Sequence, residues 1–291
     1  YGGGYNCGVT GTANINMNNG QVTGSIYGGA YQNQVQTETN VNIFGGTVED
    51  VYGGNVLTSV AQLNSDNSSQ NANIIIGNKD LDTTPMVNGT VYGSGKYDRL
   101  GTVEIQLIKC NTTPAVFGGS DTNGITSEAN IYLNDMTAST VYGGSRNDGT
   151  VIKANIYLNS GTVTDIYGGG YGGSTTTANV NLDGTATVTS IYGGPNTSGK
   201  VETSNVDLKS GNITNVYGGG NSADVVTANV TLNGITIDSI HGGSKKSGVT
   251  TNTNVILNSG TVINVYGAGL DAGAVNANVT QIGATVTNIY G

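Results

Sequence analysis

The stretch Ile166-Tyr167-Gly168-Gly169 decides the fold, because versions of it return along the whole chain. A β-branched residue, an aromatic or histidine ring and a glycine recur with the ring at residues 27, 52, 92, 117, 142, 167, 192, 217, 241, 266 and 290. Successive rings lie 24 to 26 residues apart, with one spacing of 40. Such a period predicts a repeat architecture, in which each unit buries its apolar face only against its neighbours. We therefore expect one elongated domain over residues 1–291.

The composition is typical of an ordered β repeat that carries little charge. Glycine accounts for 48 of 291 residues, charged residues for 10%, and the formal net charge is −9. The negative charge argues against nucleic acid or an anionic membrane as a partner. Membrane insertion is not expected either, since no run of about 18 apolar residues occurs. No signal peptide is visible and the chain begins inside a repeat, so we expect a mature or excised portion of a longer protein.

Each unit alternates apolar and polar residues, as a strand with one buried face does. In one unit the residues expected to point inward are Ile152, Ala154, Ile156 and Leu158. A turn is expected at 159–161, a short strand at 162–164, a corner or bulge at Asp165 and a third short strand at 166–167. This pattern predicts an all-β, parallel β-solenoid of about 11 coils with a 25-residue repeat. At about 4.8 Å per coil the rod would be roughly 50 Å long.

Stacking converts each repeated position into a column of like residues. The valine or isoleucine before the ring is expected to form the most regular column of the core. The glycine after the ring indicates either a positive φ or a lack of room for a Cβ atom. Asparagine recurs at residues 14, 40, 73, 130, 155, 179, 205, 229, 254 and 278, and only the unit around Glu104 lacks it. We expect these amides to hydrogen-bond along the axis, as in cross-β assemblies.

The repeat is irregular over about 55–115, where insertions lengthen two connections within 55–88. Insertions in repeat proteins form loops on one face, where function is often located. They leave one enzymatic alternative open, a carbohydrate-active β-helix or phage-type fibre with its site in the irregular coils 55–111. Its candidate acids are Asp80, Asp82 and Asp98. On the regular faces no two carboxylates are in register, so the paired acids of glycoside hydrolysis are absent there.

Other catalytic and metal-binding patterns are not found. The one histidine, His241, occupies a ring position and is expected to replace tyrosine in the stack. A Ser-His-Asp triad or a zinc site cannot be assembled from one histidine without paired cysteines. Cys7 and Cys110 lie about four repeats apart, on the order of 20 Å, which is too far for a disulfide. We therefore expect no enzyme activity, no metal and no cofactor.

The tyrosine column has two interpretations. If the preceding valine or isoleucine points inward, alternation sends tyrosine outward unless a corner intervenes. The occurrence of Phe117 and His241 in the column is also consistent with a partly exposed stack. As structure, stacked rings contribute about 0.5–1.5 kcal/mol per pair. As function, a stripe of rings would offer a platform for sugars or a partner surface. The candidate binding residues are Tyr142, Tyr167, Tyr192, Tyr217 and Tyr266.

A lesser alternative is an ice-binding solenoid, which needs a flat array of regularly spaced threonines. A nearly continuous column is expected from Thr47, Thr112, Thr137, Thr162, Thr187, Thr236, Thr261 and Thr285. The column two residues further on is less regular, and ordinary β propensity also accounts for threonine here.

Units such as Ala154-Asn-Ile-Tyr-Leu-Asn-Ser-Gly-Thr-Val-Thr-Asp-Ile-Tyr-Gly-Gly-Gly170 resemble the Val-Tyr-Gly-Gly-Gly repeats of large adhesin-like surface proteins of Gram-positive and gut bacteria. The resemblance covers essentially the whole chain and includes no catalytic motif. It implies secretion to the cell surface or the extracellular space, and a fibre or stalk that contacts glycans, a host or a matrix. We therefore expect a non-catalytic structural or adhesive protein, whose open ends continue into further coils or self-associate by axial stacking.

Overall fold

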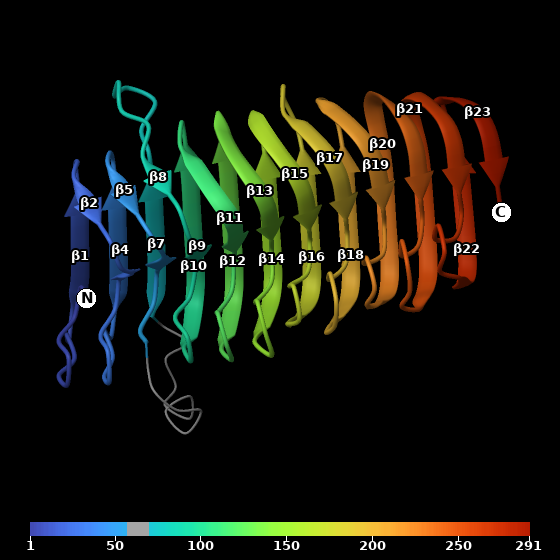
Figure 1. The fold of residues 1–291 in the computed structure, drawn as a ribbon. Coiled ribbons are helices and arrows are strands. Elements are labelled where there is room, and N and C mark those ends of the chain that lie inside the picture. The colour runs from blue at the N-terminus through green and yellow to red at the C-terminus, as the bar shows by residue number, and fades with distance from the viewer. Residues whose placement is uncertain (57–69) are drawn as a thin grey trace.

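The computed structural model describes residues 1–56 and 70–291, and over them it contains strands and no helix. The strands stand side by side from the N-terminal to the C-terminal end (Figure 1), and the paired strands are parallel. Each residue pairs with its equivalent one coil away. Asn155, for example, pairs with Asn130 on one side and Asn179 on the other. The predicted parallel β-solenoid with a repeat of about 25 residues is therefore confirmed.

Each coil has two strand-bearing sides. The first side consists of β1 (Thr12–Met17), β4 (Glu38–Ile43), β7 (Asn71–Ile76), β10 (Arg99–Ile108), β12 (Ile125–Asn134), β14 (Thr150–Leu158), β16 (Ser174–Leu182), β18 (Lys200–Leu208) and β22 (Ala274–Gln281). The second side consists of β2 (Gln21–Val22), β3 (Ile26–Tyr27), β5 (Thr47–Val48), β6 (Val51–Tyr52), β8 (Met86–Val87), β9 (Thr90–Tyr92), β11 (Asn111–Phe117), β13 (Met136–Tyr142), β15 (Gly161–Tyr167), β17 (Thr187–Tyr192), β19 (Asn212–Tyr217) and β23 (Thr285–Tyr290). The strands β20 (Asp224–His241) and β21 (Thr250–Tyr266) run through both sides.

The corner expected at Asp165 is a bulge in the pairing. Val163 pairs with Val188 and Asp165 with Ser190, while the residue between each pair is skipped. The bulge turns both Val163 and the Ile166 side chain into the core, although they are three residues apart. In the first three coils this irregularity separates two short strands, as predicted. In β15 and its later equivalents one strand runs through it.

The core follows the predicted columns, with one correction. Ala154, Ile156, Leu158 and the valine or isoleucine before the ring are buried in this coil. Ile152 was expected to point inward, but its side chain is 47% exposed, and this prediction is wrong. The pairing skips Ile152 between Val151 and Lys153, so a second bulge reverses the alternation and Val151 takes the inward position.

The glycine after each ring is required by close approach of the next coil. A Cβ atom on Gly168 would collide with the carbonyl oxygen of Gly193 and would lie 3.0 Å from the Ala178 Cβ atom. Gly168 does not have a positive φ, so of the two expected reasons the lack of room is the correct one. Positive φ occurs instead at the turn before β15, where Gly161 has φ of 105°.

The asparagine column forms the predicted hydrogen-bonded ladder. Each amide nitrogen donates to the side-chain oxygen one coil back, over 2.7–3.2 Å, at Asn40, Asn73, Asn155, Asn179, Asn205, Asn229, Asn254 and Asn278. Glu104 pairs with Asn73 and Asn130 in the backbone ladder and interrupts the series, as predicted. Because all these amides point the same way, the ladder has a direction along the rod.

Candidate functional site: the aromatic groove

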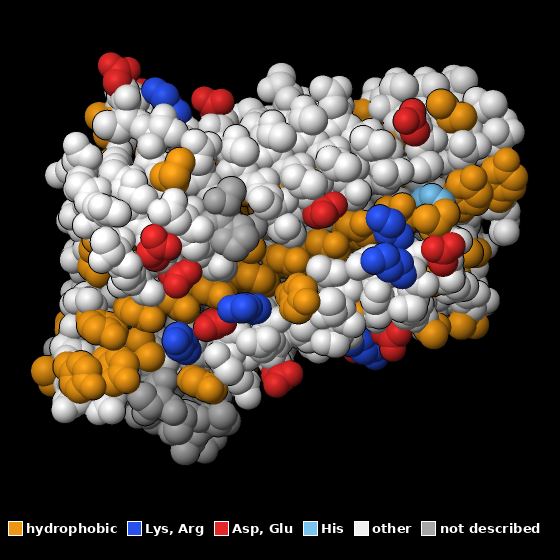
Figure 2. Space-filling view, in the orientation of Figure 1, with side chains coloured by type: hydrophobic (Ala, Val, Ile, Leu, Met, Phe, Trp, Pro, Cys, Tyr) orange, Lys and Arg blue, Asp and Glu red, His pale blue; other side chains and the backbone are white. Residues whose placement is uncertain are grey.

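The rings of the Tyr-Gly-Gly repeats form one continuous stack along the rod. From Tyr1 to Tyr290, successive ring centroids lie 4.5–5.5 Å apart with interplanar angles of 3–16°. This spacing follows from the backbone, since parallel strands lie about 4.8 Å apart. Figure 2 shows the stack as a hydrophobic stripe across the molecule, with the single histidine inside it and charged side chains along its edges.

The stack is less exposed than expected. Tyr142, Tyr167, Tyr192 and Tyr217 are each exposed by 6% or less, and Tyr266 near the C-terminal end is half-buried. The prediction of a partly exposed stack is wrong for the first four, because each ring covers the faces of the next. The five candidate binding residues do lie together in one row. What they present to a ligand is ring edges and hydroxyl groups, so binding by these residues stays a proposal.

The hydroxyl edge of the stack is bounded by a polar rim that the sequence analysis missed. Arg146 Nη1 donates to the Tyr92 hydroxyl (3.0 Å), and Asn196 Nδ2 donates to the Tyr142 hydroxyl (3.1 Å). Lys245 Nζ donates in the same way to the Tyr192 hydroxyl (3.0 Å). Each rim residue follows a ring by four positions, in the loop that varies most between repeats. The signal was therefore a fixed offset rather than a repeated residue type.

The rim joins coils that are not adjacent. Arg146 follows ring 142 and bonds to Tyr92, with ring 117 in between. The Tyr52 hydroxyl donates to Asp121 (3.5 Å), which follows ring 117 and is again two coils further on. The stacked rings, the bonded hydroxyls and the rim together form the aromatic groove.

Burial and charge keep the phenols of the groove protonated. Desolvation raises the pKa of Tyr92 to about 12, and the neighbouring Arg146 partly offsets the shift. The ammonium group of Lys245 lies 5.5 Å from the Tyr217 ring centroid, within range of a cation–π contact. Arg146 also forms an ion pair with Asp121 (3.2 Å). The groove therefore combines neutral hydroxyls with balanced charges at the rim.

The acids of the irregular coils do not form a paired site. Asp80 and Asp82 are exposed in the loop after β7, where the Leu81 carbonyl accepts a hydrogen bond from Lys109 at the far end of β10. Asp98 immediately precedes β10 and is fully buried. Strand β10 has 10 residues and is about 33 Å long at about 3.3 Å per residue, so its length separates Asp98 from the other two acids. Residues 57–69 of the insertion lie outside the described residues.

Asp98 instead belongs to a buried polar cluster. It accepts hydrogen bonds from the backbone nitrogen of Asn55 (2.6 Å) and from the Asn55 amide, which also donates to Gln70 (3.1 Å). Burial raises the pKa of Asp98 to about 6. The cluster joins the two ends of the first insertion to the next coil. Sequence periodicity could not reveal it, because none of these side chains repeats.

The threonine column is exposed on the second side. Thr162 pairs with Thr137 and Thr187, and all three are exposed, as are the residues two positions further on from Ser139 to Thr287. The assignment of Thr112 to this column is wrong. Thr112 pairs with Ala138 and is buried, because the register of β11 shifts beyond Thr112, and Asn111 takes the outward position instead.

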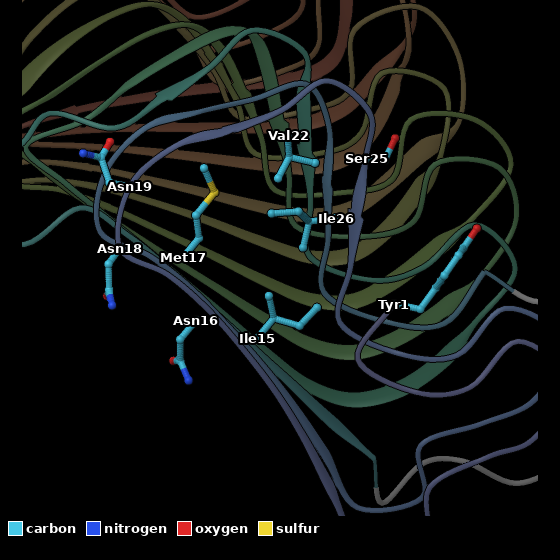
Figure 3. Close-up of a pocket in the computed structure, with 9 residues that line it drawn as sticks. All are labelled: Tyr1, Ile15, Asn16, Met17, Asn18, Asn19, Val22, Ser25 and Ile26. Carbon is cyan, nitrogen blue, oxygen red and sulfur yellow. The ribbon is translucent and has the colours of Figure 1, made fainter.

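A hollow of about 540 Å³ lies at the N-terminal end of the rod (Figure 3). Its apolar lining is Ile15, Met17, Val22 and Ile26, which are the core columns of the first coil. The hollow is therefore the end of the core and not a separate site.

Cys7 and Cys110 are free thiols, as predicted. Among the residues that the structure describes, no cluster of three His, Cys, Asp or Glu side chains could hold a metal ion. The described residues also contain no helix that is long and apolar enough to cross a membrane.

No family model, no curated protein and no solved structure matches this chain. The class of the protein is therefore defined by its fold, a parallel β-solenoid with a continuous aromatic stack.

Proposed function

We propose that this chain is a segment of a non-catalytic structural and adhesive rod, located outside the cell or at its surface. The observation that carries the proposal is that the core column, the amide ladder and the aromatic stack all run in register along the rod. Repeat proteins of this kind gain stability with each added coil and hold their ends at a fixed distance. The repeated positions therefore serve axial stacking.

The polar side chains support a structural role over a catalytic one. Catalysis needs groups that are directed at a substrate and have matched pKa values. Here the amides of Asn155 and its equivalents bond to one another, and the hydroxyls of Tyr92, Tyr142 and Tyr192 bond to the rim. The resemblance to adhesin-like repeats supports the extracellular location and a glycan, host or matrix partner.

Axial stacking is part of the proposal. The edge strands β1 and β22 carry the same backbone pattern that pairs the inner coils, so a coil of this repeat fits against either edge. Electron microscopy of the native material should show elongated fibres. Short, monodisperse particles of the full-length protein would contradict the proposal. So would turnover of uronic-acid or neutral polysaccharides that the Asp82→Asn substitution abolishes.

A second candidate, ice binding, is favoured by the exposure of both outward columns on β13, β15 and β17. Asp238 and Ile263 interrupt the second column, which is why we place this function below the first. Measurement of ice recrystallisation decides between them. The Thr189→Lys substitution should abolish any inhibition if the face binds ice, whereas absence of inhibition in the wild-type protein removes this candidate.

A further inference from the structure

The aromatic groove has one position where the hydroxyl-to-rim bond cannot form. In the regular pattern a tyrosine bonds to the rim residue 54 positions later, as in Tyr92–Arg146 and Tyr142–Asn196. The corresponding pair at the intermediate coil is Phe117 and Tyr171. Phe117 has no hydroxyl, and the rim position holds a second aromatic ring. The groove is therefore left open at this point.

The open position is a pocket, which we call the Phe117 notch. It has a volume of about 350 Å³, within the range of small-ligand sites. Its lining consists of Thr90, Ala115, Phe117, Thr140, Tyr142, Arg146, Asn147 and Tyr171. The step from Tyr92 to Phe117 is also the widest in the stack, at 5.5 Å between centroids. The missing hydroxyl thus coincides with a local widening.

Tyr171 gives the notch an aromatic surface that the stack itself does not offer. Its ring is 42% exposed and stands at 82° to the Tyr142 ring, with 6.1 Å between centroids. The faces of the stacked rings are covered by their neighbours, whereas Tyr171 lies edge-on outside the stack. The carbon-bound hydrogens of a pyranose ring form an apolar face of the kind that packs on such a ring.

Polar groups surround this surface at the positions where sugar hydroxyls need partners. The Thr90 and Thr140 side chains lie on one side, and Arg146 and Asn147 on the other. Arg146 uses Nη1 for its bonds to Tyr92 and Asp121. Its Nη2 and Nε atoms form no hydrogen bond with the described residues and can donate to two adjacent hydroxyls.

The charge balance selects a neutral ligand. Arg146 is the only cationic residue that lines the notch within the described part of the chain, and Asp121 already pairs with it. A carboxylated sugar would have to compete with Asp121 and approach a chain with a net charge of −9.

We infer that the Phe117 notch binds one neutral pyranose residue of a glycan. This inference rests on the proposed adhesive function and deepens it by naming the ligand class and the residues. Tyr171 stacks on the sugar, while Arg146, Asn147 and Thr140 bond to its hydroxyls. Phe117 provides the space that a tyrosine hydroxyl would fill.

The experiment uses the whole chain with defined neutral probes, namely cellotetraose, mannotetraose, galactotetraose and chitotetraose, and with tetragalacturonate as a charged probe. Saturation-transfer NMR identifies binding, and calorimetric titration measures it. We expect at least one neutral probe to bind with a Kd of about 1 mM, as befits contacts to a single sugar. Phe117→Tyr should abolish this binding without unfolding the chain, because most other coils hold tyrosine there.

Tyr171→Ala should weaken binding about tenfold through loss of the stacking surface, whereas Asn221→Ala, two coils further on at the same rim position, should leave it unchanged. The inference is overturned if no neutral probe binds, if tetragalacturonate alone binds, or if Phe117→Tyr keeps the wild-type affinity. Electron microscopy of the native material tests the rod separately, so the rod can stand when the sugar site fails.

Discussion

Replacement of Asn155 by aspartate tests whether the amide ladder stabilises the rod. The Asn155 side chain is almost fully buried and donates to Asn130 (2.7 Å) and to the Glu128 carboxylate (2.9 Å). It also accepts a bond from Asn179 (2.7 Å). An aspartate keeps the acceptor but has no donor, and it places a second carboxylate beside Glu128.

The magnitude follows from the bonds that are lost. A neutral hydrogen bond contributes about 1 kcal/mol and one to a carboxylate about 1.5–3 kcal/mol, so we expect Asn155→Asp to lower the free energy of unfolding by about 3 kcal/mol at pH 7. The assay is urea denaturation followed by circular dichroism, with hydrogen exchange of the β14 amides as a local measure. Thr164→Asp adds the same charge at an exposed position and should cost less than about 0.5 kcal/mol.

The same variant makes a prediction about pH. Near pH 4 the new carboxyl group and Glu128 take up protons, so the aspartate becomes a donor and the repulsion disappears. We therefore expect the destabilisation to fall to less than half of its value at pH 7. A loss below 0.5 kcal/mol at pH 7, or a loss that does not change at pH 4, would refute a stabilising amide ladder.

The remaining predictions concern three buried positions. Burial lowers the pKa of His241 to about 4 from the ordinary 6.5, so the folded chain should lose stability as pH falls from about 6.5 to 4, and His241→Tyr should remove that loss in thermal denaturation at several pH values. Burial raises the pKa of Asp98 to about 6 from the ordinary 3.8, which has the opposite sign: stability from this group rises as pH falls from about 6 to 4, and a titration of Tm in Asp98→Asn should lack that rise. Gly168→Ala should cost about 1–3 kcal/mol in urea denaturation because its Cβ atom would collide with the Gly193 carbonyl, and unchanged stability would show that the coils can separate freely.

The fold could be predicted because its determinants are periodic. The spacing of the rings, the inward column that includes Ile166 and the asparagine ladder each follow from one residue type at one interval. Parallel stacking turns such an interval directly into a register. The interruption at Glu104 was predicted for the same reason.

The errors arose where the strands depart from strict alternation. The bulges at Ile152 and after Thr112 reverse which face a side chain occupies, and a period-two pattern cannot locate them. The burial of the tyrosines depends on rings of other coils that cover their faces, a contact between residues about 25 positions apart. The rim residue Arg146 and the notch at Phe117 depend on pairs 54 positions apart and on loops without a repeated sequence.

The hydroxyl bonds that skip a coil have a mechanical consequence. A solenoid held only by adjacent contacts frays from its end one coil at a time. Here the coils of Tyr92, Tyr142, Tyr192 and His241 are braced to one another through Arg146, Asn196 and Lys245. Pulling the His241 coil away therefore strains the Tyr192 coil across the coil between them. Under tension the braced region should rupture in blocks longer than one repeat, which gives the rod a resistance to unzipping that its short strands alone would not provide.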